Sequence, residues 1–409
     1  MFAPRSIPWP LVALFTAGYL APYLLPTTVG RLDSGLPLTA TQAGAIGSAL
    51  LLSSASAGFV LVSRVERIGA RTLSRAGLAL AVLGYGIAAL SGDVPTVVVG
   101  ALLGGFGSGT ATTVAAAGIS AMGVPPREGV RAWGTDPHRT TTLGLLGVSA
   151  LAGALYLTIP HLGPGHGQPL AALALTALAV WPLTGRLPVR TAAPHRPLDG
   201  RRLPHFRSGL LLAVAMPCWS LVQNSLWGVS GRIGLTQARL TESTVGAVFA
   251  VALGAGLLGV TVAGAVGPRF GRALPVGAGT ALIAGCVLVS ASATDLTTFA
   301  TGEIAWNLLY PVVLSYVIGL AASLDPRGRW AVLVGSASSL GTAAGPLTGS
   351  VLAARAGFPA MGAELAVGLL VIAVPMTVVA LGVGRRSLPV VEIPVETTAA
   401  QRPYDTTAA

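Results

Sequence analysis

The chain has 409 residues, of which 53% are hydrophobic and only 10% are charged, and its mean hydropathy is +0.74. A water-soluble domain carries about 25% charged residues, so this composition excludes a soluble protein. The formal net charge of +11 does not indicate nucleic-acid binding, because aromatic residues make up only 6% of the chain and are not interleaved with basic runs. The composition therefore predicts an integral membrane protein.

Apolar runs long enough to cross a bilayer recur along the whole chain. A hydrocarbon core about 30 Å thick needs roughly 20 apolar residues per helix. The first run is longer than the core of a signal peptide and lacks a clear small-x-small cleavage site. We expect twelve transmembrane helices in two sets of six, at residues 8–28, 42–62, 72–91, 95–118, 141–159 and 169–185, and then at 209–228, 243–264, 273–293, 297–321, 330–354 and 361–384.

A polar stretch rich in Arg, His and Pro separates the two sets, and its composition cannot bury a core. The sequence therefore predicts an N-terminal six-helix bundle over residues 1–185, a cytoplasmic linker over 186–208 and a C-terminal six-helix bundle over 209–386. The polar residues 387–409 are expected to form a disordered cytoplasmic tail.

The basic residues predict the orientation of these helices. All 25 are Arg, and 21 of them fall on the side that also holds both termini, leaving only Arg31, Arg232, Arg239 and Arg355 on the other side. By the positive-inside rule, both termini are cytoplasmic. Because abundant Arg, Ala and Gly suggest a GC-rich bacterial genome, we expect a multi-pass protein of a bacterial plasma (inner) membrane.

The chain also contains an internal repeat. When it is shifted on itself by 202 residues, LTATQAGAI from Leu38 aligns with LTESTVGAV from Leu240. The same register pairs charged and loop residues over more than sixty positions, among them Arg67 with Arg269, Gly69 with Gly271 and Asp93 with Asp295. Duplicated six-helix units of this kind are typical of secondary transporters.

Short motifs in the loops carry a resemblance to a known family. The segment V-S-R-V-E-R-I-G-A-R, Val62 to Arg71, resembles the G-x-x-x-D-R-x-G-x-R signature of the major facilitator superfamily, and Gly264 to Arg272 is its second copy. Ala101 to Gly109 resembles the glycine pattern of the family's fourth span, and GVRAW near Arg131 and GRWAV near Arg329 resemble its entries to spans five and eleven. The resemblance implies an all-α membrane fold of two pseudo-symmetric six-helix bundles.

The resemblance also implies a cytoplasmic gate, made of Glu66, Arg67, Gly69, Arg71, Arg269 and Gly271. The carboxylate of Glu66 replaces the family's Asp, and it would stabilise the positive end of the helix that begins near Trp330. The chain departs from the family at Val62, Pro268 and Ala101, which replace a Gly, an acid and an Arg. The alternative is that Glu66 is a solvated loop charge.

Glu303 is the only acid well inside a predicted span, roughly 9 Å below the outer boundary, with Asn307 one turn deeper. An ionisable side chain at such a depth costs about 3 kcal/mol or more and normally faces a bundle interior or a wet cavity. In the family, spans one, four, seven and ten line the central cavity, so the resemblance implies that Glu303 faces it. The alternative is an acid that reaches the outer interface or is bonded to a neighbouring helix.

Further polar and aromatic residues are candidates for contact with a substrate. Span seven carries Gln223, Asn224 and Trp227, span one carries Tyr19 and Tyr23, and Trp306 lies beside Asn307 in span ten. Together they predict a pocket of rings and amides with one acid. The alternative for Trp227 and Tyr23 is a place in an interfacial aromatic belt.

These features favour a secondary active transporter that moves a small organic molecule by alternating access, with protons as the coupling ion and export as the direction. An acid among rings suits an amphipathic cation or a neutral aromatic solute. The alternatives are uptake of a neutral metabolite and a membrane sensor or scaffold that does not transport. The spans lack a catalytic set and the chain lacks a G-x-x-x-x-G-K-[ST] motif, so we expect no enzyme, no cofactor, no metal and no nucleic-acid partner, and a functional monomer in the lipid bilayer.

Overall fold

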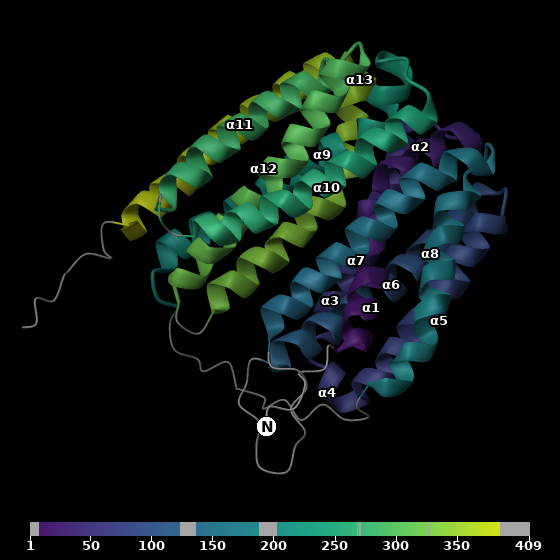
Figure 1. Ribbon diagram of the computed structural model, residues 1–409, viewed down its shortest axis with the longest axis horizontal. Helices are drawn as coiled ribbons and strands as arrows, with labels where there is room; N and C mark the ends of the chain where they lie inside the picture. The colour runs from purple at the N-terminus through teal and green to yellow at the C-terminus, as the bar shows by residue number, and fades with distance from the viewer. Residues whose placement is uncertain are drawn as a thin grey trace, which may run out of the picture.

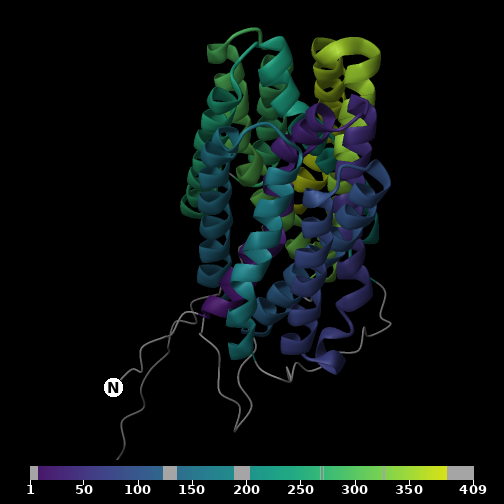
Figure 2. The same ribbon diagram turned by 90° about the vertical axis from the view of Figure 1, so that its right-hand side faces the viewer.

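A computed structural model describes residues 8–122, 136–187, 203–267, 269, 271–325 and 328–384, and every regular element in these ranges is helical. Figure 1 shows the helices as one bundle, and the turned view in Figure 2 shows that they run roughly side by side. Most of the predicted linker, the predicted tail, Arg131 and Pro268 lie outside the described residues.

Within the described residues, the N-terminal half contains eight α-helices and the C-terminal half contains five. The first eight are α1 (Trp9–Tyr23), α2 (Leu25–Gly35), α3 (Ala40–Leu61), α4 (Val65–Ile68), α5 (Ala70–Leu90), α6 (Val94–Met122), α7 (Pro137–Thr158) and α8 (Gly167–Val180). The others are α9 (Phe206–Arg232), α10 (Glu242–Val266), α11 (Ala273–Ala291), α12 (Leu296–Ser323) and α13 (Arg329–Gly384). Three short helical segments follow α7, α8 and α9: η1 (Ile159–Leu162), η2 (Trp181–Arg186) and η3 (Ile233–Gln237).

Among the described residues, ten helices are long and apolar enough to cross a membrane, or eleven if the bent pair α1 and α2 is one span. The predicted all-helical membrane fold is therefore confirmed. α13 has 56 residues, and Gly357 interrupts it with φ 78° and ψ 168°. Since one crossing needs about 20 residues, α13 is long enough for two, although the count of twelve spans stays a prediction.

Several spans continue beyond their predicted ends, α6 among them, and the first and seventh do so where α2 contacts α9. The first was expected to end at residue 28, but α1 bends by 49° into α2, which continues to Gly35. Pro22 lies inside α1 and Pro26 in the first turn of α2, where each removes a backbone donor from the bend. The seventh was expected to end at 228, whereas α9 runs to Arg232. The end of α9 is buried, including Arg232, whereas α2 ends with exposed Ser34 and Gly35, and its Arg31 is buried mainly by residues of its own half.

The repeat places equivalent caps on equivalent helices. Thr39 accepts a hydrogen bond from the backbone of Gln42 at the start of α3, and Thr241 does the same for Thr244 at the start of α10. Asp93 and Asp295 cap α6 and α12 through Thr96 and Thr298. Hydrogen bonds from the Ser91 side chain and from Thr96 lower the pKa of Asp93 to about 2. Each of these four caps joins residues three apart in the chain, so the caps follow from the local sequence.

Close glycine contacts bring repeat-related helices together in the same way. A Cβ added at Gly100 of α6 would lie 2.8 Å from the Cβ of Ala88 in α5. A Cβ added at Gly302 of α12 would lie 2.7 Å from the backbone nitrogen of Ser290 in α11. Ala88 and Ser290 are 202 residues apart, as are the two glycines. The contact at Gly302 holds Ser290 against the turn of α12 that carries Glu303.

The two halves meet most closely at one end of the bundle. The α2 end of the N-terminal half contacts α9, and the first part of α3 contacts α13, where the Ser48 hydroxyl accepts a hydrogen bond from the backbone nitrogen of Leu347 at 2.9 Å. Figure 1 shows the helices of the two halves together near α2 and further apart toward α4. We call the end at α2 the latch end and the end at α4 the motif end.

Candidate functional site

Glu303 lies fully buried between three helices of the C-terminal half, with 0% of its surface exposed. Its Oε1 atom is 2.7 Å from the hydroxyl of Ser230 in α9 and 2.5 Å from the hydroxyl of Ser290 in α11. Its Oε2 atom has no hydrogen-bond partner among the described residues. Sequence reasoning found this acid but not the two serines that hold it.

The hydroxyl of Ser230 has two acceptors within reach, because it also lies 3.0 Å from the backbone oxygen of Leu226. A hydroxyl carries one proton and can donate to only one of them. If the carboxyl of Glu303 is protonated, it donates to Ser230, which then donates to Leu226, and both contacts are satisfied. If the carboxyl is ionised, Ser230 must donate to it, and the hydrogen bond from Ser230 to the backbone oxygen of Leu226 is lost. The geometry thus accommodates a proton on Oε1.

The repeat shows that the fold does not need an acid at this position. Shifting by 202 residues places Glu303 on Ala101, Ser290 on Ala88 and Ser230 on Thr28. Ala101 and Ala88 are buried in the N-terminal half, as their counterparts are in the C-terminal half. Burial of an ionisable group in a membrane is costly, so a packing role, which alanine fills in the other half, is a weak explanation of Glu303.

The three amides predicted around Glu303 are each bonded elsewhere. Asn307 donates to the backbone oxygen of Glu303 at 3.0 Å. Asn224 donates to the backbone oxygen of Ser220 at 2.9 Å and to the Thr342 hydroxyl at 3.3 Å, and Gln223 accepts a hydrogen bond from the indole of Trp306. The amides therefore lie near the acid along α9 and α12, and these bonds do not involve its carboxyl group.

Aromatic rings form a continuous row along α9 and α12, which we call the ring cluster and define by Trp219, Tyr310, Trp306 and Trp227. Consecutive ring centroids in this order are 5.2, 5.7 and 5.5 Å apart. Tyr310 is half-buried and lies near Tyr19 and Tyr23 of α1. Tyr19 is 37% exposed although it lies in a transmembrane helix. The predicted pocket residues of spans one, seven and ten are thus brought together.

Trp227 belongs to the contact between the halves and not to an interfacial belt. Its side chain is buried, and its indole donates to the backbone oxygen of Pro22 in α1 at 3.0 Å. Its ring also packs against Phe249 of α10, with 5.2 Å between the centroids, and against Tyr156 of α7 at 6.5 Å. In this conformation Trp227 closes the latch end beneath its polar surface.

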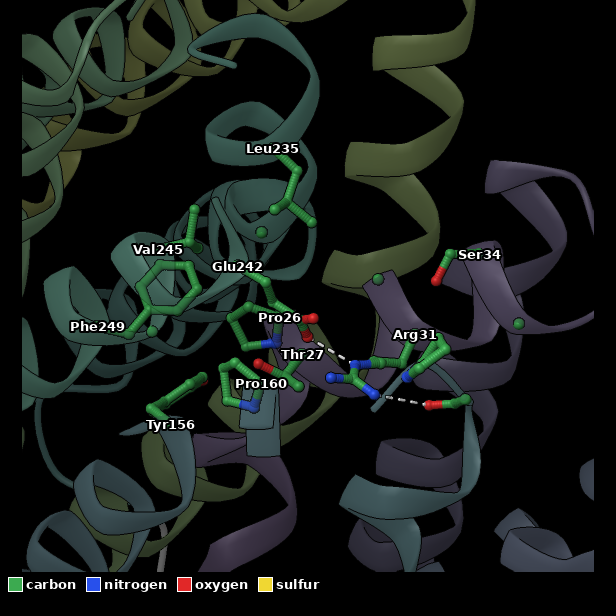
Figure 3. A pocket seen from close by; sticks show the side chains of 16 residues that line it. Pro26, Thr27, Arg31, Ser34, Tyr156, Pro160, Leu235, Glu242, Val245 and Phe249 are labelled. Carbon is green, nitrogen blue, oxygen red and sulfur yellow. Dashed lines mark hydrogen bonds and ion pairs between the residues drawn. The ribbon is translucent and has the colours of Figure 1, made fainter. Parts of the chain in front are cut away.

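A vestibule of about 390 Å³ lies at the latch end between the two halves. Figure 3 shows Arg31 and Glu242 beside each other in it, with the dashed contact between them, and Tyr156 and Phe249 further along its wall. Arg31 comes from α2 and Glu242 from the first turn of α10, so their ion pair joins the two halves. The Arg31 Nε and Glu242 Oε1 atoms are 2.6 Å apart.

Arg31 is held mainly by its own half. Its guanidinium donates to the backbone oxygens of Ile159, Gly163 and Gly165 and to the side chain of Gln168, at distances from 2.7 to 3.2 Å. Only 5% of Arg31 is exposed, whereas the Glu242 side chain is 38% exposed. The guanidinium is thus fixed in the N-terminal half, and its Nε–H donates to the carboxylate of Glu242 in the C-terminal half.

A second pair of opposite polarity lies nearby. Arg232 of α9 has a nitrogen 3.9 Å from Asp33 of α2, and it also donates to the hydroxyl of Ser350 in α13 at 3.1 Å. Arg31 and Arg232 carry a sequence signal only for orientation, and neither is predicted from the sequence to belong to a site. Arginines just beyond an apolar run are commonly exposed, so the position of these two in the sequence does not indicate that they are buried.

At the motif end, the predicted gate is described only in part. Arg67 and Arg269 are exposed, and Gly69 and Gly271 have φ values of 91° and 65°, which favour glycine. Arg71 donates twice to the backbone oxygen of Leu187, at 3.0 and 2.8 Å. The side chain of Glu66 lies outside the described residues, so its contact with the helix that begins near Trp330 stays a prediction.

No family model matches the sequence, and no curated protein matches it in a sequence comparison. Solved structures do share its fold. The human organic anion transporter MFSD10 matches with a TM-score of 0.64 and 16% identity, over 92% of this chain and 100% of that one. A bacterial homologue of the human lysosomal transporter Spinster, solved in an inward-facing and unoccupied conformation, matches with 0.64 and 14% over 93% and 95%. The nucleoside transporter NupG matches with 0.65 and 12% over 94% and 100%. The chain therefore shares the fold of these transporters, an all-α membrane fold as predicted.

Proposed function

We propose that the protein is a secondary active transporter that exports a small organic molecule in exchange for protons. The observation that supports this best is the buried group of Glu303, Ser230 and Ser290 in the C-terminal half, where the N-terminal half has Ala101, Thr28 and Ala88. Glu303 is a proton acceptor at a position where the other half has an alanine, and it lies beside a cluster of rings and amides. Such an arrangement suits coupling of proton movement to solute movement.

Alternating access is supported by where the halves touch. Two ion pairs, Arg31 with Glu242 and Arg232 with Asp33, join the halves at the latch end. At the motif end, the described arginines Arg67 and Arg269 are exposed. The latch end is thus closed in this conformation. A rocking motion that separates the two ion pairs would open the ring cluster toward the latch end.

The substrate we propose is a ring-bearing molecule that is neutral or carries a positive charge. The ring cluster offers large flat surfaces, and Asn224, Asn307 and Thr342 add half-buried polar groups. α1 and α12 contain no Arg, the two Arg residues of α9 lie near its ends, and the sequence has no Lys. The three helices that carry the rings therefore offer no basic side chain beside them to pair with an organic anion, although MFSD10 is described as transporting such solutes.

Export requires an orientation, and we propose that the latch end faces the outside of a bacterial plasma membrane and both termini face the cytoplasm. The basis is the 21 to 4 division of the arginines. A reporter inserted near Pro194 or fused after Arg386 should therefore report a cytoplasmic location. A periplasmic signal from either place would overturn this orientation and the twelve-span arrangement.

The proposed function is tested by transport in vesicles that contain the purified protein and carry an imposed pH gradient. A matched set of three naphthalene probes, namely a neutral alcohol, a quaternary ammonium and a carboxylate, separates the substrate classes. We expect the neutral or the cationic probe to accumulate only with the gradient, and the carboxylate to stay at the level of empty vesicles. Accumulation of the carboxylate alone, or accumulation that ignores the gradient, would contradict the proposal. If no solute moves, a membrane sensor or scaffold becomes the better explanation.

A further inference from the structure

A second cavity opens on the side of the N-terminal half. This groove of about 850 Å³ runs between α7 and α8, and the first turns of α1 form its floor. Figure 1 shows α7 and α8 apart, with α1 visible between them. The groove shares no lining residue with the vestibule at the latch end. It is therefore a feature separate from the site described above.

The groove faces outward from the bundle. Leu162, Leu175 and Trp9 line it and are 64%, 63% and 55% exposed. Most of its other lining residues are Ala, Val, Leu or Ile. In a membrane protein, exposed apolar side chains on the outer surface of the bundle face lipid, so the groove is accessible from within the bilayer.

The length of the groove is close to the thickness of a hydrocarbon core. Its lining along α8 and η2 extends from Gln168 to Arg186. At 1.5 Å per residue in α8 and about 2.0 Å per residue in the 3-10 segment η2, this distance is about 30 Å, which is also the thickness of a bilayer core. An acyl chain that enters from one mouth would lie along the half of the groove on that side, about 15 Å, which is the share of one leaflet in the core.

One mouth of the groove is basic. Arg186 lines this mouth and is exposed. Arg75 of α5 donates to the hydroxyl of Thr184 at 3.2 Å, two residues before Arg186, and it is also exposed. Within the described parts of the chain, no carboxylate pairs with either arginine. Trp9 lies at the same mouth, as is common for a Trp at the level of lipid head groups.

We infer that this groove binds a phospholipid with an anionic head group, whose phosphate lies at Arg186 and whose acyl chain lies along α8. Basic pockets between transmembrane helices bind anionic head groups, and a guanidinium forms strong charge-assisted hydrogen bonds with phosphate. The apolar walls account for the binding of the chain and Arg186 accounts for the binding of the head group, so both parts of the ligand have a partner in the structure.

Trp9 provides a direct measurement of this binding. The protein is placed in phosphatidylcholine vesicles that contain either phosphatidylglycerol or phosphatidylcholine with brominated chains, and bromine quenches a nearby Trp. The signal of Trp9 is the difference between the unchanged protein and the variant Trp9→Phe. We expect half-maximal quenching at an about fivefold lower fraction of brominated phosphatidylglycerol than of brominated phosphatidylcholine, since one Arg beside an anionic head group, here Arg186, favours binding by about that factor.

Two variants show whether the arginine is responsible. Arg186→Gln should remove most of the preference for phosphatidylglycerol, whereas Arg139→Gln should keep it, because Arg139 is an exposed arginine at the start of α7 that does not line the groove. Equal quenching by both brominated lipids in the unchanged protein would overturn the proposal, since it would mean unselective solvation. A preference that survives in Arg186→Gln would overturn it too. Neither result depends on transport.

Discussion

Replacing Glu303 with Gln should abolish accumulation driven by a pH gradient and leave downhill exchange of the same solute measurable. The amide keeps the size of the side chain and can still bond to Ser230 and Ser290, which lie 2.7 and 2.5 Å from Oε1 in the unchanged protein. It cannot release a proton. With one coupled proton, a gradient of one pH unit supports an accumulation ratio of up to about ten, and this ratio should fall to one in the variant.

Controls separate this effect from unfolding and from changes elsewhere. Glu364→Gln removes an exposed acid of α13 and should transport normally. Ser290→Ala introduces the residue that the N-terminal half has at the equivalent position, Ala88, so it should fold while altering the pH dependence of transport. Full gradient-driven accumulation by Glu303→Gln would return Glu303 to a packing role. If only cationic solutes lose binding in Glu303→Gln, the acid contacts the substrate instead of carrying a proton.

The sequence predicts most of the fold because a membrane imposes a simple requirement. Each crossing needs a long apolar run, and such runs can be read directly, as the agreement between the predicted span at 273–293 and α11 (Ala273–Ala291) shows. The predictions fail where polar residues are buried by distant parts of the chain. Arg31 ended the first predicted span, yet backbone oxygens of residues 159–165 surround it, and no local pattern indicates that they would.

The candidate site was predictable to a similar degree. Glu303 stands out because it is an acid inside an apolar run, and its burial follows from that alone. Its partners Ser230 and Ser290 lie on other helices, and small hydroxyl residues are too common in such helices to be noticed individually. The repeat carries a usable signal, since shifting by 202 residues aligns the acid with Ala101 and Ser290 with Ala88. That comparison identifies the positions at which one half departs from the other.

Removing the charge of Glu242 should open the latch end. In Glu242→Gln, Arg31 keeps its four bonds within the N-terminal half, so the fold remains intact and only the attraction between the halves is lost. A partly exposed ion pair contributes about 1 kcal/mol, which corresponds to a roughly fivefold shift of the conformational population toward the latch-open state. Adding Asp33→Asn, which removes the partner of Arg232, should increase the shift further.

This shift can be measured by chemical labelling. Cys218 and Cys286 are first replaced, and Val245→Cys then provides a reporter, because Val245 lines the vestibule and is buried in the latched state. A membrane-impermeant maleimide should modify this cysteine about five times faster in Glu242→Gln than in the background protein, in keeping with the shift expected above. Glu364→Gln should leave the rate unchanged.

Arg31→Gln is the less informative variant, since it also leaves the backbone oxygens of Ile159 and Gly163 without their donor. Equal labelling in Glu242→Gln and in the background would mean that apolar contacts such as that of Trp227 with Phe249, and not the ion pair, hold the halves together at this end.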